Sequence, residues 1–162
     1  MMQYSDIIFG DQNEWEVASG VPHIPFEALD ENYEIDKEAY LKYFRKMHKL
    51  FPKCKKMVMA VRNQIASSHH TLSGLLYDAV EDQLYTTRIY DIEPIVDPMG
   101  VGDAFVAAYI HAHQKWGDKN QYCLDFSLSA SAIKNTIPGD QNLVSEEEII
   151  NNMTSSGGRI QR

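Results

Sequence analysis

The sequence has little of several features that mark large classes of protein. Its 162 residues include only two cysteines, Cys54 and Cys123, in no metal-binding or redox spacing, so we expect two reduced thiols and no disulfide framework. Positive charge is scarce, since 15 Lys and Arg face 23 Asp and Glu and give a formal net charge of −8. General binding to nucleic acid or to an anionic membrane surface depends on positive charge and is therefore not expected.

Long apolar runs and a phosphate-loop signature are missing as well. No apolar stretch approaches the roughly 20 residues that span a bilayer. Residues 1–6 (MMQYSD) lack the basic region and the apolar core of a secretory signal. We therefore expect a cytoplasmic protein that binds no membrane. The chain also has no GxxxxGK[ST] loop, which excludes a Walker-type nucleotide site.

What the sequence does contain is an alternation of strand and helix signals over the length of one domain. Apolar runs predict strands at 5–9, 57–61, 73–79 and 83–90, with a hairpin turn at 78–82. The run at 57–61 (MVMAV) is continuous, which is typical of a strand buried on both faces in a parallel sheet. Helices are predicted at 11–19, 36–50, 102–116 and 121–135, and a capping box (SEEE) opens another at Ser145. This order indicates an α/β fold.

The segment with the clearest chemistry is 96–105 (VDPMGVGDAF), a loop that runs into a helix. Glycines at 100 and 102 allow a tight turn and a close approach by another group. The first N–H groups of the helix have no intrahelical partner and, with the helix dipole, favour an anion. Asp103 lies in the first turn beside them. A carboxylate next to a phosphate site is useful where it takes the proton of a hydroxyl that attacks the phosphate.

On spacing alone this segment has a second interpretation. A Gly-x-Gly-Asp sequence before a helix is also typical of an ordinary loop-to-helix junction with no ligand.

The segment DPMGVGDAF (97–105) resembles the Asp-x-x-Gly-x-Gly-Asp signature of the ribokinase-like (PfkB) carbohydrate kinases. Asn13 and Glu16, which follow a predicted strand, match the Asn-x-x-Glu motif of the same family. Residues 61–78, 134–149 and 157–162 are similar to the C-terminal portion of bacterial 2-keto-3-deoxygluconate kinases. The resemblance covers the chain from about residue 5 to residue 162.

The resemblance implies a ribokinase-like three-layer (Rossmann-like) sheet flanked by helices. Residues 1–153 correspond to the nucleotide-binding C-terminal half of such a kinase, and we expect residues 154–162 to form a mobile tail. The implied reaction is ATP-dependent phosphorylation of a sugar hydroxyl, with 2-keto-3-deoxygluconate as acceptor and its 6-phosphate as product. ATP and Mg²⁺ are the implied cofactors.

The resemblance also assigns roles to individual residues. Asp103 corresponds to the base, and Gly100, Val101 and Gly102 correspond to the anion hole. The other implied roles concern nucleotide binding. Asn13 and Glu16 correspond to the residues that organise Mg²⁺ and the ATP phosphates largely through water, with Glu16 nearest the metal. Arg62 and Asn63 approach the phosphates, and residues 132–135, with Ala132 and Asn135, line the adenine pocket.

Two departures from the family pattern shape further expectations. Met99 and Val101 are bulkier than the usual residues, so we expect them to reshape the pocket. The chain is also shorter than full family members and resembles a truncated kinase without the sugar-binding half, so we expect little activity from it alone. An exposed sheet edge would then favour a homo-oligomer. Two alternatives stay open: another sugar or nucleoside kinase, and a non-catalytic nucleotide-binding fragment that self-associates.

Overall fold

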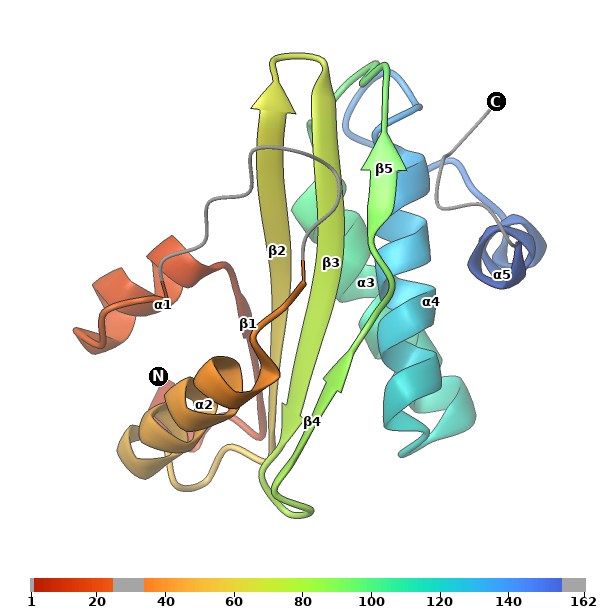
Figure 1. Ribbon diagram of the computed structural model, residues 1–162. Helices are drawn as coiled ribbons and strands as arrows, with labels where there is room; N and C mark the ends of the chain where they lie inside the picture. The colour runs from red at the N-terminus through yellow and green to blue at the C-terminus, as the bar shows by residue number, and fades with distance from the viewer. Residues whose placement is uncertain (1, 25–33, 156–162) are drawn as a thin grey trace.

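The computed structural model describes residues 2–24 and 34–155, and Figure 1 shows them as a central sheet flanked by helices. A 3-10 turn, η1 (Met2–Tyr4), precedes the first strand. The remaining elements in chain order are β1 (Ile7–Gly10), α1 (Gln12–Ser19), α2 (Lys37–Leu50), β2 (Lys56–Ala66), β3 (His69–Asp78), β4 (Gln83–Thr86), β5 (Tyr90–Ile92), α3 (Val101–Trp116), α4 (Asn120–Lys134) and α5 (Glu146–Thr154). The tail predicted to be mobile lies outside the described residues from 156 onward.

The sheet is mixed. β1 runs parallel to β2, whereas β3 is antiparallel to β2 and pairs with both β4 and β5. The predicted hairpin at 78–82 is confirmed, and the strand predicted at 83–90 is divided into β4 and β5. The strand predicted at 57–61 is buried as expected, but the expectation of a parallel sheet around it was wrong on one side. A second tight hairpin joins β2 directly to β3, and antiparallel strands need no crossover helix.

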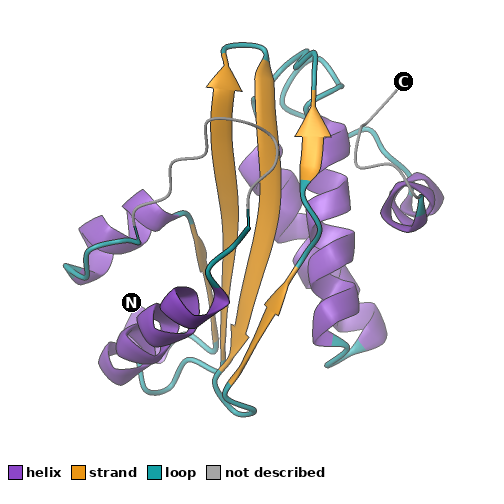
Figure 2. Ribbon diagram, viewed as in Figure 1, coloured by secondary structure: helices purple, strands orange, loops and turns teal. Residues whose placement is uncertain are grey.

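Figure 2 shows that different helices cover the two faces of the sheet, and each face has its own hydrophobic core. Neighbouring residues of β2 point to opposite faces because side chains alternate along a strand. Val58 and Leu76 pack against Phe105 in the core formed with α3, α4 and α5. Met59 packs in the other core, against an aromatic cluster of α1 and α2 that includes Phe44.

Local sequence signals set the ends of several helices. Asp11 and Glu14 form a complete capping box at the start of α1, and Ser145 and Glu148 form another at the start of α5. α1 ends at Gly20, whose φ of 70° is the left-handed conformation that glycine adopts readily. The predicted starts at Asp11 and Ser145 are therefore confirmed.

In the part of the sheet that is described, β1 pairs with β2 alone and forms one edge. No helix among the described residues is both long and apolar enough to span a bilayer.

Candidate functional site

Helix α3 begins without a side chain to cap it. Its N-cap residue is Gly100, with φ 73°, and no side-chain oxygen accepts a hydrogen bond from its first amides. The preceding turn is held by Asp97, whose carboxylate accepts hydrogen bonds from the backbone N–H groups of Met99 (3.0 Å) and Gly139 (2.8 Å). Those two bonds lower the pKa of Asp97 below its ordinary value. The uncapped amides and the helix dipole together form a site suited to an anion.

Gly100 is required by space as well as by conformation. A Cβ atom at this position would lie 2.2 Å from the carbonyl oxygen of Asp140. The loop before α3 therefore packs backbone to backbone against the loop after α4. Ser131 of α4 adds a further link, since its hydroxyl donates to the carbonyl oxygen of Val101 at 3.0 Å.

A cleft of about 390 Å³ lies beside the start of α3. Its polar side chains come from four elements or their ends: Asp11 and Glu14 at the start of α1, Arg62 of β2, Asp103 of α3 and Ser131 of α4. The rest of the lining consists of Phe9, Gly10, Ala60, Leu72, Pro98, Val101, Gly102, Phe105 and Val106. The N-terminal ends of two helices, α1 and α3, thus line one cleft.

Four of the residues that were predicted from the sequence to have a role in the site line this cleft. Asp103 lines it with an exposed side chain, and Val101, Gly102 and Arg62 line it as well. Gly100 sits immediately before them and sets the direction in which α3 starts. The structure therefore brings the loop singled out in the sequence together with residues of strand β2 in one cleft.

Asn13 and Glu16 are not among the residues that line the cleft, and their role at the nucleotide stays a prediction. Asp11 and Glu14 line it instead, with the same spacing two positions earlier. The capping box explains this, because Asp11 Oδ1 accepts from Glu14 N (2.8 Å) and Glu14 Oε2 accepts from Asp11 N (2.9 Å), which holds both carboxylates at the first turn. Glu16 pairs with His23, whose backbone and ring hydrogen bonds lower the pKa of Glu16.

Asn63, Ala132 and Asn135 are also not among the residues that line the cleft. Asn63 is buried on the opposite face of the sheet, since it follows Arg62 on the same strand. Ala132 is buried in the core beside α3. Asn135 is buried and donates to the carbonyl oxygen of Ser131 at 3.0 Å. From this stretch of α4, the residue that lines the cleft is Ser131.

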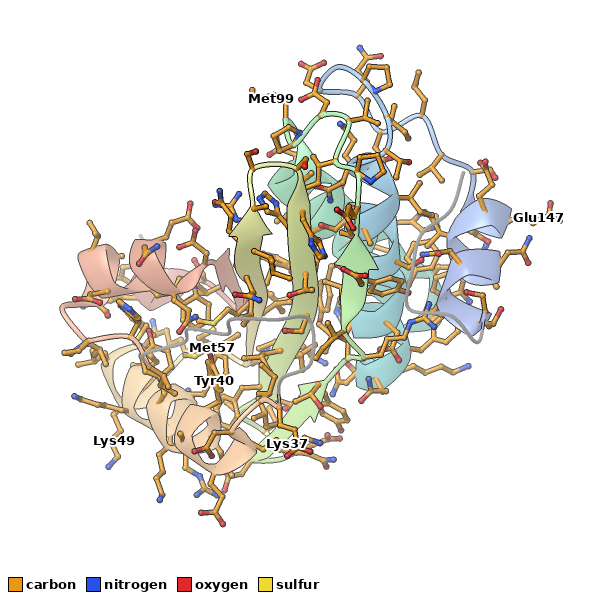
Figure 3. All side chains as sticks on the ribbon, turned by 45° about the horizontal axis from the view of Figure 1, so that its top comes forward. Lys37, Tyr40, Lys49, Met57, Met99 and Glu147 are labelled. Carbon is orange, nitrogen blue, oxygen red and sulfur yellow. The ribbon has the colours of Figure 1, made fainter. Side chains whose placement is uncertain are left out.

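The two bulky residues of the loop occupy different environments. Met99 is 64% exposed and lies on the outer side of the loop near the rim of the molecule in Figure 3. It is not among the residues that line the cleft, whereas Val101 is. The expected reshaping of the pocket therefore applies to Val101 alone.

The acidic residues of the cleft fit a metal ion that takes its other ligands from a bound substrate, rather than an ion ligated by protein side chains alone. No group of three or more His, Cys, Asp or Glu in the described part of the chain is arranged to hold a metal. Mg²⁺ is commonly bound by one or two carboxylates together with substrate phosphates and water. Asp11 and Glu14 suit that pattern, because both line the cleft and the capping box uses only one oxygen of each carboxylate.

Comparison with known proteins found likeness among solved structures only: no family model and no curated protein sequence matches the chain. The 2-dehydro-3-deoxygluconokinase of Thermotoga maritima is 28% identical with a TM-score of 0.79, over 95% of this chain and 43% of that one. A PfkB family carbohydrate kinase of Listeria grayi is 24% identical with a TM-score of 0.76, over 95% of this chain and 42% of that one. The ribokinase of Arabidopsis thaliana, solved with ribose and ATP, is 20% identical with a TM-score of 0.69, over 96% and 43%.

These structures confirm the resemblance to ribokinase-like (PfkB) carbohydrate kinases and the predicted fold class, a sheet flanked by helices. The chain spans only about 43% of the length of the Thermotoga and Arabidopsis enzymes.

Proposed function

We propose that this chain is the nucleotide-binding part of a carbohydrate kinase that transfers the γ-phosphoryl group of ATP to a sugar hydroxyl. The observation that carries the proposal is one cleft in which the exposed carboxylate of Asp103 lies beside the uncapped start of α3. A hydroxyl that attacks a phosphate needs a base and a set of donors for the phosphoryl oxygens, and the cleft supplies both. The fold shared with carbohydrate kinases supports the same conclusion.

In this proposal Asp103 is the base. The sugar oxygen bonds to the γ-phosphorus, its proton passes to the Asp103 carboxylate, and the bond between that phosphorus and the ADP oxygen breaks. The backbone amides at Val101 and Gly102 donate to the phosphoryl oxygens on which negative charge collects. Arg62 lines the same cleft from β2, and its guanidinium can pair with the remaining phosphate oxygens.

Asp11 and Glu14 are the residues that we assign to Mg²⁺, in place of Asn13 and Glu16. Their carboxylates line the cleft and would hold the ion together with ATP phosphates and water. When bound, the ion neutralises charge on the phosphates. The chain itself contributes the orientation, because the capping box fixes both side chains on the first turn of α1.

For the acceptor we propose 2-keto-3-deoxygluconate, phosphorylated to its 6-phosphate. The support is the 28% identity to the Thermotoga 2-dehydro-3-deoxygluconokinase. A different sugar is the second candidate, because a ribokinase shares the fold at a TM-score of 0.69. Since the chain corresponds to less than half of these enzymes, a third candidate is a nucleotide-binding fragment that self-associates and transfers nothing.

The test measures binding and transfer on the same protein. Binding of ADP and ATP is followed by titration calorimetry with and without Mg²⁺, and transfer is followed by mass spectrometry of the phosphorylated sugar, which detects trace turnover. We expect Asp103→Asn to lower the rate of transfer by about 10²–10⁴-fold, because the base is lost, while ADP affinity changes little. Acceptor candidates are compared in parallel.

The matched control is Asp36→Asn, which makes the same change at the start of α2, outside the cleft lining. It should leave both binding and transfer unchanged. Nucleotide binding with no transfer, together with a dimer in light scattering, would favour the fragment. A chain that binds no nucleotide, or an Asp103→Asn variant with full turnover, would overturn the proposal.

A further inference from the structure

The last residue of α4, Lys134, is completely buried, with 0% of its surface exposed. Its amino group donates to the carbonyl oxygen of Ile137 at 2.9 Å and reaches the carbonyl oxygen of Asp97 at 3.5 Å. Lysine is rarely buried to this degree unless it is paired, because removing its charge from water is costly. A lysine in this position needs a reason beyond filling space.

Both carbonyl groups belong to loops that shape the start of α3. Asp97 lies in the loop before that helix, and Ile137 lies in the loop after α4. The same two loops are joined by hydrogen bonds from the backbone N–H groups of Val96 and Asp97 to the carbonyl oxygen of Asn135, at 2.8 and 3.2 Å. Gly139 N also donates to Asp97 Oδ2. Lys134 therefore sits at the junction on which the geometry of the anion site depends.

The other buried lysine shows how unusual this arrangement is. Lys56 pairs with the carboxylates of Asp78 (3.3 Å) and Asp118 (2.8 Å). Lys134 has no carboxylate within ion-pair distance among the described residues, and its printed partners are carbonyl oxygens. Backbone carbonyl oxygens that converge on a positive charge replace its hydration shell, as they do around a bound inorganic cation.

We propose that Lys134 is a positioning residue: a built-in cation that holds residues 97–100 against residues 137–140 and so fixes the amides at the start of α3. It acts through the carbonyl groups of Asp97 and Ile137 and touches neither nucleotide nor sugar. Its importance for phosphoryl transfer rests on the proposed function, whereas its effect on the order of the two loops does not.

A purely structural role makes a different prediction. A lysine at the C-terminal end of a helix also interacts with the helix dipole, and its loss would then weaken the whole chain evenly. Hydrogen exchange separates the two cases, because it reports the opening of individual amides.

The experiment compares Lys134→Met with Ile133→Val in the full chain. Ile133 is the preceding residue of α4 and is buried in the same core as residues of α3, so its truncation loosens packing while it removes none of the hydrogen bonds that join the two loops. For Lys134→Met we expect exchange at the hydrogen-bonded loop amides of Asp97, Met99 and Gly139 to be faster by about tenfold or more, relative to exchange in β2 and β3. For Ile133→Val the ratio should stay at its wild-type value. The same ratio of loop exchange to strand exchange in both variants would overturn the proposal.

A chemical rescue gives an independent readout. Lys134→Ala leaves a space lined by carbonyl oxygens, which an ammonium ion can enter and a tetramethylammonium ion cannot. Ammonium chloride should return loop exchange toward the wild-type rate in Lys134→Ala, and should not do so in Lys134→Met, whose side chain fills the space. If neither variant folds in ordinary buffer, refolding of Lys134→Ala in ammonium but not in tetramethylammonium chloride supports the proposal. Equal behaviour in the two salts contradicts it.

ADP binding measured on the same samples separates this inference from the proposed function. A wild-type chain that binds no ADP, with loops that still loosen in Lys134→Met, would overturn the function and leave the role of Lys134 standing. A wild-type chain that binds ADP, with a Lys134→Met variant whose amides exchange like those of Ile133→Val, would overturn the role of Lys134 and leave the proposed function standing.

Discussion

Helices α1 and α3 both begin at the cleft, yet they begin in opposite ways. In α1 the carboxylates of Asp11 and Glu14 complete a capping box, so that negative side chains face the cleft. In α3 the cap position is Gly100 and no side chain accepts from the first amides. Glycine at the cap, in place of a residue with a capping side chain, forgoes only about a few tenths of a kcal/mol of stability. The contrast indicates that the two helix starts suit partners of opposite charge: an anion at α3 and a cation at α1.

A third helix start provides an internal standard. α5 opens with the capping box of Ser145 and Glu148, which resembles that of α1 but does not line the cleft between α1 and α3. Changes at α5 should therefore affect stability alone. Changes at α1 and α3 should affect stability and ligand binding together.

The largest effect is expected for Gly100→Ala. The left-handed φ of 73° and the carbonyl oxygen of Asp140, 2.2 Å from the new Cβ atom, both oppose the substitution. We expect a loss of roughly 3 kcal/mol or more in the free energy of unfolding, because backbone must move, and a loss of ADP binding. Urea denaturation and calorimetry measure the two quantities.

Gly20→Ala is the control for backbone conformation. Gly20 has a φ of 70° at the end of α1, but no atom lies within 4 Å of an added Cβ. It should cost about 1 kcal/mol and leave ADP binding intact. Equal losses of unfolding free energy in Gly100→Ala and Gly20→Ala would show that the contact between the two loops contributes nothing to stability.

Arg62→Gln should weaken ADP binding by about tenfold, the size expected for one charge-assisted contact to phosphate. Stability should hardly change, since Arg62 is exposed. Arg45→Gln removes an arginine that pairs with Asp82 on the surface, outside the cleft lining. That variant should keep its ADP affinity. If Arg45→Gln weakens binding as much as Arg62→Gln, net charge and not the cleft governs affinity.

A smaller effect is expected for Asp11→Asn, because asparagine caps a helix as well as aspartate does. Stability should change by less than about 0.5 kcal/mol, while the Mg²⁺ dependence of ATP affinity is reduced severalfold. Ser145→Ala should behave in the reverse manner, with a loss of about 1 kcal/mol and unchanged nucleotide binding. Measuring ATP affinity across a Mg²⁺ series tests both. An unchanged Mg²⁺ dependence in Asp11→Asn would remove α1 from the metal site.

The sequence predicted the start of α3 because glycine spacing and a following apolar helix are local signals. Asp103, Val101, Gly102 and Arg62 reached the cleft as expected. The start of α1 was predicted too, since Asp11 is a good N-cap residue. The motif on that helix was counted from Asn13, whereas the residues of α1 that line the cleft are Asp11 and Glu14, which the capping box ties together.

Other placements depended on information that is not local. Which face of β2 a residue occupies follows from strand register, so Asn63 could not be separated from Arg62 without the pairing of β2 with β3. The same holds for Ala132, which is buried in the core on the α3 side of the sheet and is not among the residues that line the cleft. The mixed sheet was missed because an apolar run such as 57–61 does not reveal the direction of its neighbours.

The smallest effect concerns Asp97, which holds the loop before α3 through amide hydrogen bonds. Its pKa is below the ordinary value of 3.8 in the folded chain. The ionised carboxylate therefore stabilises the fold above pH 3.8, and this contribution is lost as the pH falls through the lower, folded value. Asp97→Asn should be less stable than the wild type at pH 7, and the difference should narrow at pH values below 3.8. Urea midpoints across a pH series measure it.

The control for this titration is Asp82→Asn. Hydrogen bonds from Arg45 and Tyr77 lower the pKa of Asp82 to about 2, so its stability difference also narrows in acid, with the same sign. Asp82 is on the surface, outside the cleft lining, and its contribution depends on an ion pair that salt screens. At 1 M salt, by the screening length of about 3 Å at that concentration, the effect of Asp82→Asn should shrink while that of Asp97→Asn persists. Only Asp97→Asn should weaken ADP binding at pH 7, because only Asp97 holds the loop that leads into the amides of α3; a loss of equal size in Asp82→Asn would break the distinction between the two helix starts.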